Sequence, residues 1–309
     1  MKIAVLFPGQ GSQHPGMGRE FFENFKVSSD IYGLADEVLG FSISKLMLEG
    51  PEEELKLTYN AQPALLTCSI AIWEVIKDKL SVSAFAGHSL GEYSAVVAAG
   101  GMRFEDAVLA VHNRGRFMQE AVPVGVGAMA AVLGGDTDKV VALCKEISKE
   151  NFVVEPANFN CDGQVVVAGN TEAVDLFISR IRETGAKRGV KLPVSAPFHC
   201  SLMKPAQLKM ADYLSDVAVS DTKVPVYNNV EGKCQSSGAE IKDALIRQVS
   251  GAVMWTNEIN NMIKDGIDLF VEVGAGNVLT GLVKKINKDV KAFNVSTVDD
   301  MKKLEELHV

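Results

Sequence analysis

Ser89 is the residue whose type and surroundings most clearly indicate chemistry. It is the centre of Gly87-His88-Ser89-Leu90-Gly91, between an apolar run at residues 82–86 and a helix-like run at residues 92–99. A sharp turn between a buried strand and a helix projects the central side chain outward, and flanking glycines let the backbone pack closely. The segment therefore predicts a nucleophilic serine. The alternative is a glycine-rich loop in which Ser89 only caps the helix.

A serine hydroxyl needs a general base before it can act as a nucleophile. The five histidines of the chain are His14, His88, His112, His199 and His308. His199 is the strongest candidate, because it stands in a loop where the chain returns from a predicted inserted domain to the main domain. The alternative for His199 is a loop histidine that caps the helix containing Lys204.

The other histidines are weaker candidates for this base. His88 is adjacent to Ser89, and neighbouring side chains at such a turn point in different directions. His112 lies inside a predicted helix at residues 104–120, and His308 lies in the terminal tail. His14, in the N-terminal loop, remains an alternative base.

Apolar runs that alternate with helical patterns position these residues. Strands are predicted at residues 3–7 and 82–86, and helices at residues 64–77 and 104–120. Such alternation is typical of an α/β domain built around a parallel sheet. Further strands at residues 224–228 and 269–273 extend the same pattern near the C-terminus.

A different pattern occupies the middle of the chain. Strands are predicted at residues 128–133, 152–158, 164–168 and 190–194. Between them lie a helix with Val140, Cys144 and Ile147 on one face and a helix with Val174, Phe177, Ile178 and Ile181 on one stripe. The order β-α-β-β-α-β is ferredoxin-like. We therefore predict an inserted domain at residues 125–195 within a catalytic domain formed by residues 1–124 and 196–309.

Composition excludes several function classes. The chain has 309 residues, 47% hydrophobic and 23% charged, with a net charge of −8, which disfavours nucleic acid as a partner. None of the five cysteines forms a Cys-x-x-Cys pair or a His/Cys cluster, so neither a zinc site nor a disulfide framework is predicted. Residues 1–7 are too short for a signal-peptide core and no apolar run is long enough for a membrane span, so a cytoplasmic protein is expected.

The glycine-rich turns do not match the spacing of nucleotide-binding motifs. His14 and Leu279 stand where Gly9-Gln10-Gly11 and Gly274-Ala275-Gly276 would each need a third glycine. Gly232-Lys233 is followed by cysteine and lacks the upstream glycine of a P-loop. These segments are interpreted as tight turns, and no cofactor is expected.

In these residues and in further segments, the chain resembles the malonyl-CoA:acyl carrier protein transacylases over nearly its whole length. Besides the Ser89 segment with Glu92, the matching pieces are residues 7–13 (FPGQGSQ), 62–64 (QPA), 114–119 (RGRFMQ), 158–160 (NFN), 163–166 (GQVV), 197–199 (PFH), Gln248 and 272–274 (EVG). The resemblance implies an α/β-hydrolase-like large domain with a ferredoxin-like insertion. The chain differs at Ala252 and Ala275, where the family often has proline.

The resemblance also implies roles for individual residues. Ser89 would be the nucleophile and His199 the base, with the backbone N–H groups of Leu90 and Gln10 in the oxyanion hole. Two preorganised N–H donors stabilise the negative charge that develops on a thioester carbonyl oxygen. Gln248 would orient His199 in place of the acid of hydrolases.

Two further residues would select the substrate. Arg114 would receive the malonyl carboxylate, since a guanidinium matches a carboxylate with two charge-assisted hydrogen bonds. The alternative is a solvated helix arginine, as expected for Arg116. Phe198 resembles the malonyl-preferring branch, in which a bulky ring leaves little room for an α-methyl group.

The expected reaction is a ping-pong transfer of malonyl from malonyl-CoA to the phosphopantetheine thiol of acyl carrier protein, without metal or redox cofactor. The alternatives are a serine acyl hydrolase, with Asp136 or Asp162 completing a triad, and a non-catalytic carrier-binding scaffold. The carrier would dock on a local basic patch, for which the candidates are Lys187, Arg188, Lys191, Lys204 and Lys209.

Overall fold

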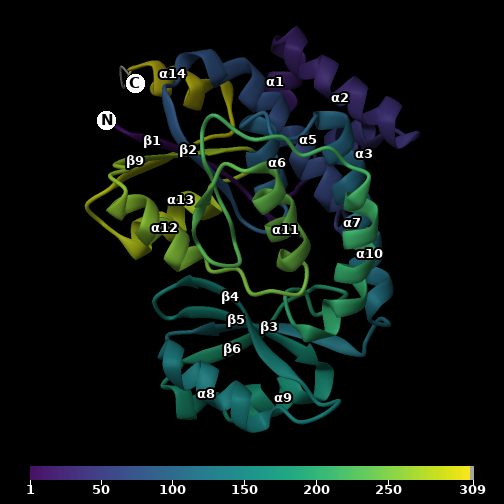
Figure 1. Cartoon of the computed structure of the whole chain (residues 1–309), viewed down its shortest axis with the longest axis vertical. Coiled ribbons are helices and arrows are strands. Elements are labelled where there is room, and N and C mark those ends of the chain that lie inside the picture. Colours follow the sequence, from purple (N-terminus) through teal and green to yellow (C-terminus); the bar gives the residue numbers. More distant parts are fainter. Residues whose placement is uncertain (307–309) are drawn as a thin grey trace.

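A six-stranded sheet forms the centre of the larger part of the molecule in the computed structural model, which describes residues 1–306 (Figure 1). Its strands, in spatial order, are β10 (Lys291–Val295), β9 (Leu269–Val273), β1 (Ile3–Phe7), β2 (Val82–Gly87), β7 (Val226–Tyr227) and β8 (Cys234–Gln235). Neighbouring strands are parallel except for the antiparallel pair β7 and β8. The central strands β1 and β9 are buried along their whole length, which explains their continuous apolar sequences.

Helices cover both faces of this sheet (Figure 1). In chain order they are α1 (Arg19–Asn24), α2 (Lys26–Leu39), α3 (Ile43–Glu49), α4 (Glu52–Leu55), α5 (Thr58–Ile76), α6 (Gly91–Ala98), α7 (Phe104–Ala121), α10 (Lys204–Ser215), α11 (Gly238–Gln248), α12 (Trp255–Lys264), α13 (Val278–Ile286) and α14 (Val298–Glu306). Helix α5 packs against α2 and α7, and nearly all of its side chains are buried. The described residues include no helix with the length and apolar character needed to cross a membrane.

A separate four-stranded antiparallel sheet forms the smaller part, in the spatial order β4 (Val154–Cys161), β5 (Gln164–Asn170), β3 (Gly127–Leu133) and β6 (Arg188–Lys191). Helices α8 (Thr137–Ile147) and α9 (Thr171–Ser179) lie on its face away from the six-stranded sheet (Figure 1). Val140 and Phe177, from the two helices, are fully buried against strand residues such as Val167. The protein is therefore a mixed α/β structure with one mainly parallel and one antiparallel sheet.

Strand β4 also joins the two parts of the molecule. The Phe159 N–H donates to the Val253 carbonyl at 2.9 Å, and the Val253 N–H donates to the Ala157 carbonyl at 2.8 Å. The Thr256 hydroxyl donates to the Phe159 carbonyl at 3.0 Å. These bonds fix the smaller sheet beside the loop that follows α11.

Several elements differ from the sequence prediction. The strand predicted at residues 152–158 lies at Val154–Cys161. The helix predicted at residues 64–77 begins at Thr58 and contains Pro63. Pro63 cannot donate to the Tyr59 carbonyl, and His112 Nδ1 lies 2.8 Å from that oxygen, so a side chain replaces the missing bond. The strand predicted at residues 190–194 lies at Arg188–Lys191, and the one predicted at 224–228 is only Val226–Tyr227.

A further difference is the predicted stripe of Val174, Phe177, Ile178 and Ile181. Helix α9 ends at Ser179, and Ile181 begins a 3-10 helix that ends at Thr184. Ile181 is still buried, because the 3-10 turn brings it back to the same face as Phe177. His308 lies outside the described residues.

Candidate functional site

Ser89 lies on a sharp turn between β2 and α6, in the left-handed backbone region with φ 52°. Both flanking glycines are needed for close packing. A Cβ on Gly87 would lie 2.0 Å from the Gly91 backbone, and a Cβ on Gly91 would lie 2.1 Å from the Phe7 carbonyl oxygen. The turn therefore presents the Ser89 side chain at the carboxyl end of the parallel sheet, where ligands bind in such folds.

His199 contacts Ser89 directly, with Nε2 2.7 Å from Oγ. Its other ring nitrogen, Nδ1, faces two carbonyl oxygens, that of Gln248 at 3.0 Å and that of Gly251 at 3.1 Å. Carbonyl oxygens only accept hydrogen bonds, so Nδ1 carries the proton and Nε2 presents its lone pair to the serine hydroxyl. This is the tautomer that a general base for Ser89 requires.

Burial keeps His199 neutral. The residue is 4% exposed, and desolvation lowers its pKa to about 3, with a further contribution from the positive charge of Arg114. Hydrogen bonds from Nδ1 to the Gln248 and Gly251 carbonyls oppose this shift only in part. At neutral pH the ring is therefore able to accept a proton.

Arg114 projects from α7 into the same site and is 1% exposed. Its Nη2 donates to Ser89 Oγ at 3.1 Å and to Gln248 Oε1 at 2.7 Å, and its Nη1 donates to Gln62 Oε1 at 2.6 Å. The guanidinium also lies over the Tyr93 ring, 5.9 Å from its centre. A buried cation held by neutral oxygen acceptors can receive an anionic ligand.

Arg116, two positions along the same helix, has the opposite environment. It is exposed and forms an ion pair with Glu120 at 3.7 Å. The structure therefore separates the two arginines of this helix, which sequence alone could distinguish only through the family resemblance.

Gln248 lies in the site. Within the described residues, however, its side chain forms no hydrogen bond with the His199 ring. Its backbone carbonyl accepts from His199, whereas its Nε2 donates to the Ser89 carbonyl at 2.8 Å and to Glu92 Oε2 at 2.7 Å. The loop that follows Gln248 supplies the second carbonyl, from Gly251. Ala252, where proline is common in the family, directly follows that glycine.

The two backbone N–H groups expected in the oxyanion hole lie on neighbouring turns. Leu90 is the N-cap residue of α6, where backbone N–H groups have no partner within the helix. Gln10 follows Gly9, and a Cβ on Gly9 would lie 2.6 Å from the His88 carbonyl oxygen. The loop after β1 is therefore packed against the Ser89 turn, as two convergent donors require.

The other candidate bases, and the candidate triad acid Asp136, have different partners. His88 Nε2 is 2.9 Å from Asn160 Oδ1, and its ring packs against Trp255 with 5.5 Å between ring centres. His14 is exposed and contacts the Pro15 carbonyl. Asp136 is the N-cap of α8, accepting from the Lys139 N–H at 2.9 Å. None of these contacts involves Ser89 or His199.

Sequence reasoning missed two residues that organise the site. Gln62 was noted only as part of a matching segment, yet it holds Arg114 Nη1. Asn229 gave no sequence signal, although its Oδ1 accepts the Ser89 N–H at 2.6 Å. Both act across large separations along the chain, which a reading of local patterns does not detect.

Phe198 is 7% exposed and directly precedes His199, within the large hydrophobic core. Ala275, the other position where proline is common, is also buried, between Gly274 and Gly276, whose φ values are 139° and 81°. The described residues contain no cluster of three or more His, Cys, Asp or Glu side chains that could hold a metal ion.

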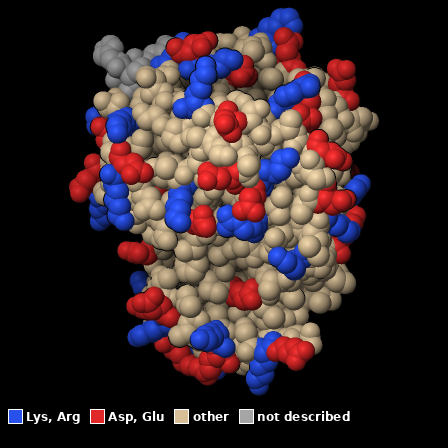
Figure 2. All heavy atoms as spheres, viewed as in Figure 1, with Lys and Arg blue, Asp and Glu red and all other residues tan. Residues whose placement is uncertain are grey.

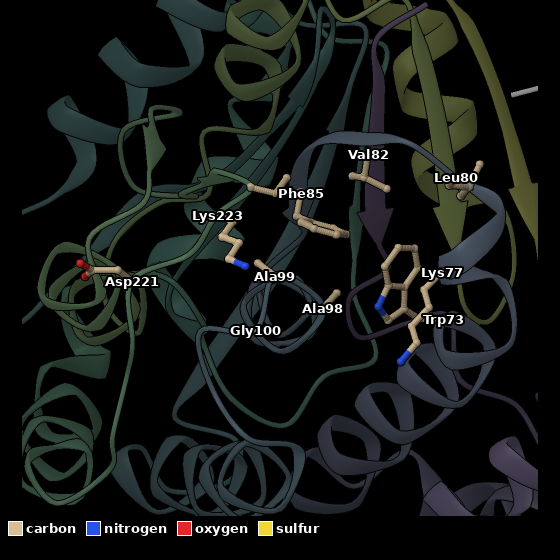
Figure 3. A pocket seen from close by; sticks show the side chains of 11 residues that line it. Trp73, Lys77, Leu80, Val82, Phe85, Ala98, Ala99, Gly100, Asp221 and Lys223 are labelled. Atoms are coloured by element: carbon tan, nitrogen blue, oxygen red, sulfur yellow. The ribbon is translucent and has the colours of Figure 1, made fainter.

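A separate cavity of about 490 Å³ opens at the amino end of β2, where Val82 and Phe85 line it (Figure 3). Its lining includes Trp73, Val82, Phe85 and Lys223. The Trp73 and Phe85 rings meet edge to face with 5.3 Å between their centres. Because Ser89 follows the opposite end of the strand, this cavity does not belong to the site described above.

Comparison with known proteins is consistent with this geometry. The chain is 48% identical over 296 residues to a malonyl CoA-acyl carrier protein transacylase of Bacillus subtilis, covering 96% of this chain and 93% of the relative. It is 47% identical over 287 residues to the protein of the same name from Salmonella typhimurium, covering 92% and 93%.

Solved structures agree with the sequence relatives. An acyl carrier protein S-malonyltransferase from Vibrio cholerae superimposes with a TM-score of 0.96 at 42% identity, covering 98% of this chain and 100% of the other. A structure described as a type II PKS acyl-carrier protein in complex with its malonyl-transacylase matches equally well, with a TM-score of 0.96, 42% identity and coverage of 99% and 100%. Residues 5–305 match the family described as acyl transferase domain, and the chain belongs to that family.

Proposed function

We propose that this protein transfers malonyl from malonyl-CoA to the phosphopantetheine thiol of acyl carrier protein through a malonyl-Ser89 ester. The observation that carries the proposal is the position of Ser89 Oγ, 2.7 Å from His199 Nε2 and 3.1 Å from Arg114 Nη2. A nucleophile, a neutral base and a buried cation thus meet at one atom. The names of the relatives support the same two substrates.

In the first half-reaction, Ser89 Oγ attacks the thioester carbonyl while its proton passes to His199 Nε2. The charge that develops on the carbonyl oxygen is stabilised by the N–H groups of Leu90 and Gln10, a contribution of ~3 kcal/mol per donor. The intermediate then expels the CoA thiolate, which takes the proton from His199. The products are malonyl-Ser89, CoA and a neutral His199.

The second half-reaction uses the same groups in reverse. His199 Nε2 accepts the proton of the phosphopantetheine thiol as the sulfur attacks the malonyl ester. The same two N–H groups stabilise the second oxyanion, and Ser89 Oγ leaves with the proton from His199. Malonyl is then bound to the carrier and the free enzyme is restored.

Arg114 is the residue that supports malonyl as the acyl group. The malonyl carboxylate is the only anionic group near the reacting carbon, and a buried guanidinium beside Ser89 would pair with it. Phe198 would narrow the pocket next to His199 and disfavour an α-methyl group. Acetyl, which has no carboxylate, would leave the cation without an anionic partner.

A serine hydrolase with an acidic third residue is less well supported. In place of a carboxylate, His199 Nδ1 faces the carbonyl oxygens of Gln248 and Gly251, and Asp136 is used to cap a helix. A carrier-binding scaffold without activity would not require the 2.7 Å contact between Ser89 and His199. Neither alternative is favoured by a specific observation.

The proposal extends to domains and location. The order β4-β5-β3-β6, with α8 and α9 on one face, supports a ferredoxin-like domain at residues 125–195. The mainly parallel sheet with a serine on the turn after β2 supports an α/β-hydrolase-like domain at residues 1–124 and 196–309. All five cysteines are free, which is typical of a reducing compartment and supports a cytoplasmic location.

Mass spectrometry after brief incubation with malonyl-CoA tests the proposal. We expect one malonyl group on the peptide that contains Ser89, and none in Ser89→Ala, a change that removes a single oxygen from a partly buried turn. Malonylation of Ser89→Ala would overturn the assignment of the nucleophile. Rapid release of free malonate without carrier would instead identify a hydrolase.

A further inference from the structure

Asn229 connects the Ser89 turn to two buried carboxyl groups, although it is not one of the residues that react. It follows β7 and is fully buried. Because β7 is the parallel neighbour of β2, the residues that follow these two strands lie side by side. Asn229 therefore lies next to the turn that carries Ser89.

The Asn229 side chain uses all of its hydrogen-bonding groups. Oδ1 accepts from the Ser89 N–H at 2.6 Å, and Nδ2 donates to the Gly87 carbonyl at 2.8 Å and to Glu258 Oε1 at 2.8 Å. Exchanging the amide oxygen and nitrogen would set the NH₂ group against the Ser89 N–H. The partners themselves therefore fix the orientation of this amide.

Asn229 also donates hydrogen bonds to two buried carboxyl groups. Its backbone N–H donates to Glu92 Oε2 at 3.0 Å, and its Nδ2 donates to Glu258. Gln248 Nε2 donates to the same Glu92 oxygen at 2.7 Å. Helices α6 and α12, which carry these carboxyl groups, thus hold Asn229 and Gln248 in one connected network.

This network holds the backbone of Ser89 on both sides. Asn229 Oδ1 takes the Ser89 N–H, and Gln248 Nε2 donates to the Ser89 carbonyl at 2.8 Å. Ser89 is a non-glycine residue with positive φ, a strained conformation that persists only where the surroundings impose it. The Ser89 N–H is also directed away from the substrate, so that the next N–H, that of Leu90, is the one available to an oxyanion.

We propose that Asn229 is a positioning residue that fixes the Ser89 turn, and thereby the direction of Oγ and of the Leu90 N–H. The inference rests on the proposed function, since it concerns the rate at which Ser89 is malonylated. Asn229 acts through the backbone of Ser89 and does not contact malonyl-CoA. Its loss should therefore slow the chemical step and leave substrate binding by Arg114 unchanged.

Asn229→Asp tests this role, because it keeps the size of the side chain and replaces the Nδ2 donor with an acceptor. The second carboxylate oxygen of the new side chain would then face the Gly87 carbonyl and Glu258 Oε1. Asn228→Asp is the matched control. Asn228 is also buried, but among the described residues its side chain bonds only within its own loop: Nδ2 donates to the Lys233 carbonyl at 3.2 Å and Oδ1 accepts from the Glu231 N–H at 2.8 Å.

Single-turnover loading of malonyl is measured over a range of malonyl-CoA concentrations, with the final fraction of loaded protein determined by mass spectrometry. For Asn229→Asp we expect the maximal rate to fall by about 10- to 100-fold, the half-saturating concentration to change by less than about threefold, and nearly every folded molecule to load eventually. Asn228→Asp should load at a rate within about twofold of the unmodified protein.

Two results would overturn the inference. One is an Asn229→Asp rate within about twofold of the Asn228→Asp rate. The other is a normal rate with a reduced loaded fraction, as expected if Asn229 only supports folding. If Asn229→Asp does not fold, Asn229→Ser provides the same comparison, since it also lacks both Nδ2 donors. Failure of the proposed function would differ from all of these, because the unmodified protein and Asn228→Asp would then take up no malonyl.

Discussion

Arg114 contacts the proposed nucleophile directly, with Nη2 donating to Ser89 Oγ at 3.1 Å. The second N–H of Nη2 is used by Gln248 Oε1, and Nη1 is held by Gln62 Oε1. The buried Nε–H has no hydrogen-bond partner among the described residues. In the proposed mechanism, Ser89 would become an ester, and the Arg114 N–H that now donates to Oγ would be free to bind the malonyl carboxylate. Loading of the serine and recognition of the acyl group would then be coupled at one guanidinium.

Arg114→Ala should shift selectivity from malonyl-CoA towards acetyl-CoA. The malonyl carboxylate would lose its partner in a largely dry pocket, at a cost on the order of 2–4 kcal/mol, whereas acetyl has no carboxylate to leave unpaired. The ratio of kcat/KM for malonyl-CoA to that for acetyl-CoA should fall roughly 30- to 1000-fold. Steady-state kinetics with both thioesters measures this ratio.

Arg116→Ala is the control, because Arg116 lies on the same helix but is exposed and paired with Glu120. We expect the ratio to remain nearly unchanged in this variant. Equal losses for both thioesters in Arg114→Ala would mean that Arg114 supports the fold or binds CoA, and the malonyl-specific pocket would have to be abandoned.

The pH dependence of loading should reflect the buried state of His199. Its pKa is lowered to about 3, chiefly by burial, so kcat/KM for malonyl loading should show no acid limb near pH 6.5. The unfolded chain gains a proton at His199 below about pH 6.5 and the folded protein does not, so the contribution of His199 to the free energy of unfolding should fall as the pH falls from 6.5 towards 3. Rapid-quench loading between pH 5 and 8 measures the profile.

His199→Ala provides the matching test of the base. Loading and transfer to the carrier should both slow by at least ~10²-fold, the usual scale for a positioned general base. Near-normal transfer in this variant would point to His14 or His88. A clear acid limb near pH 6.5 in the unmodified protein would contradict a base that is kept neutral by burial.

Glu92 should make the stability of the protein depend on pH. Burial raises its pKa from 4.5 to about 7, so between these values the folded state binds a proton that the unfolded state does not. The contribution of Glu92 to the free energy of unfolding should therefore decrease as the pH rises from 4.5 to 7, opposite in sign to that of His199. Glu92→Gln keeps an oxygen for Asn229 and Gln248 and lacks the titration. As the pH rises from 5 to 8, the free energy of unfolding of Glu92→Gln should increase relative to that of the unmodified protein by up to about 3 kcal/mol.

Urea denaturation of both proteins at several pH values measures this difference. Curves for the two proteins that stay parallel from pH 5 to 8 would mean that Glu92 remains ionised throughout, contrary to the effect of its burial.

Carrier docking should depend on local basic residues, since Lys, Arg, Asp and Glu are interspersed over the face seen in Figure 2 and the net charge is −8. Lys191 and Lys209 form ion pairs with Asp175 at 2.6 Å and Glu120 at 2.7 Å. Lys187, Arg188 and Lys204 form no ion pair within the described residues and are exposed.

We therefore expect Lys187→Glu, Arg188→Glu or Lys204→Glu to weaken transfer to an acidic carrier. Transfer by the unmodified protein should also weaken as salt shortens the Debye length below ~8 Å. Loading from malonyl-CoA in the absence of carrier serves as the internal control. A carrier step that responds neither to salt nor to these charge reversals would exclude this docking surface.

Local sequence determined the elements whose signal is carried by neighbouring residues. The Gly87-His88-Ser89-Leu90-Gly91 turn between a strand and a helix was predicted and lies between β2 and α6, because glycine spacing and hydrophobic runs act over a few positions. The β-α-β-β-α-β order of the smaller part was also predicted from such patterns, and its strands and α-helices follow one another along the chain as β3, α8, β4, β5, α9 and β6. Boundaries shifted where tertiary contacts decided them, as when the His112 side chain supports a helix that runs through Pro63.

The contacts of the candidate site were decided by tertiary structure. Ser89 and His199 are 110 residues apart, and only the arrangement of strands and loops brings Oγ and Nε2 to 2.7 Å. The resemblance pointed to Gln248 as the partner of His199, but the structure uses its backbone carbonyl for the ring and its side chain for Ser89, Glu92 and Arg114. Asn229 carries no local signal at all, because its role depends on β7 lying beside β2. Residue types and spacing specify local conformation, whereas a hydrogen bond between distant residues exists only after the chain has packed.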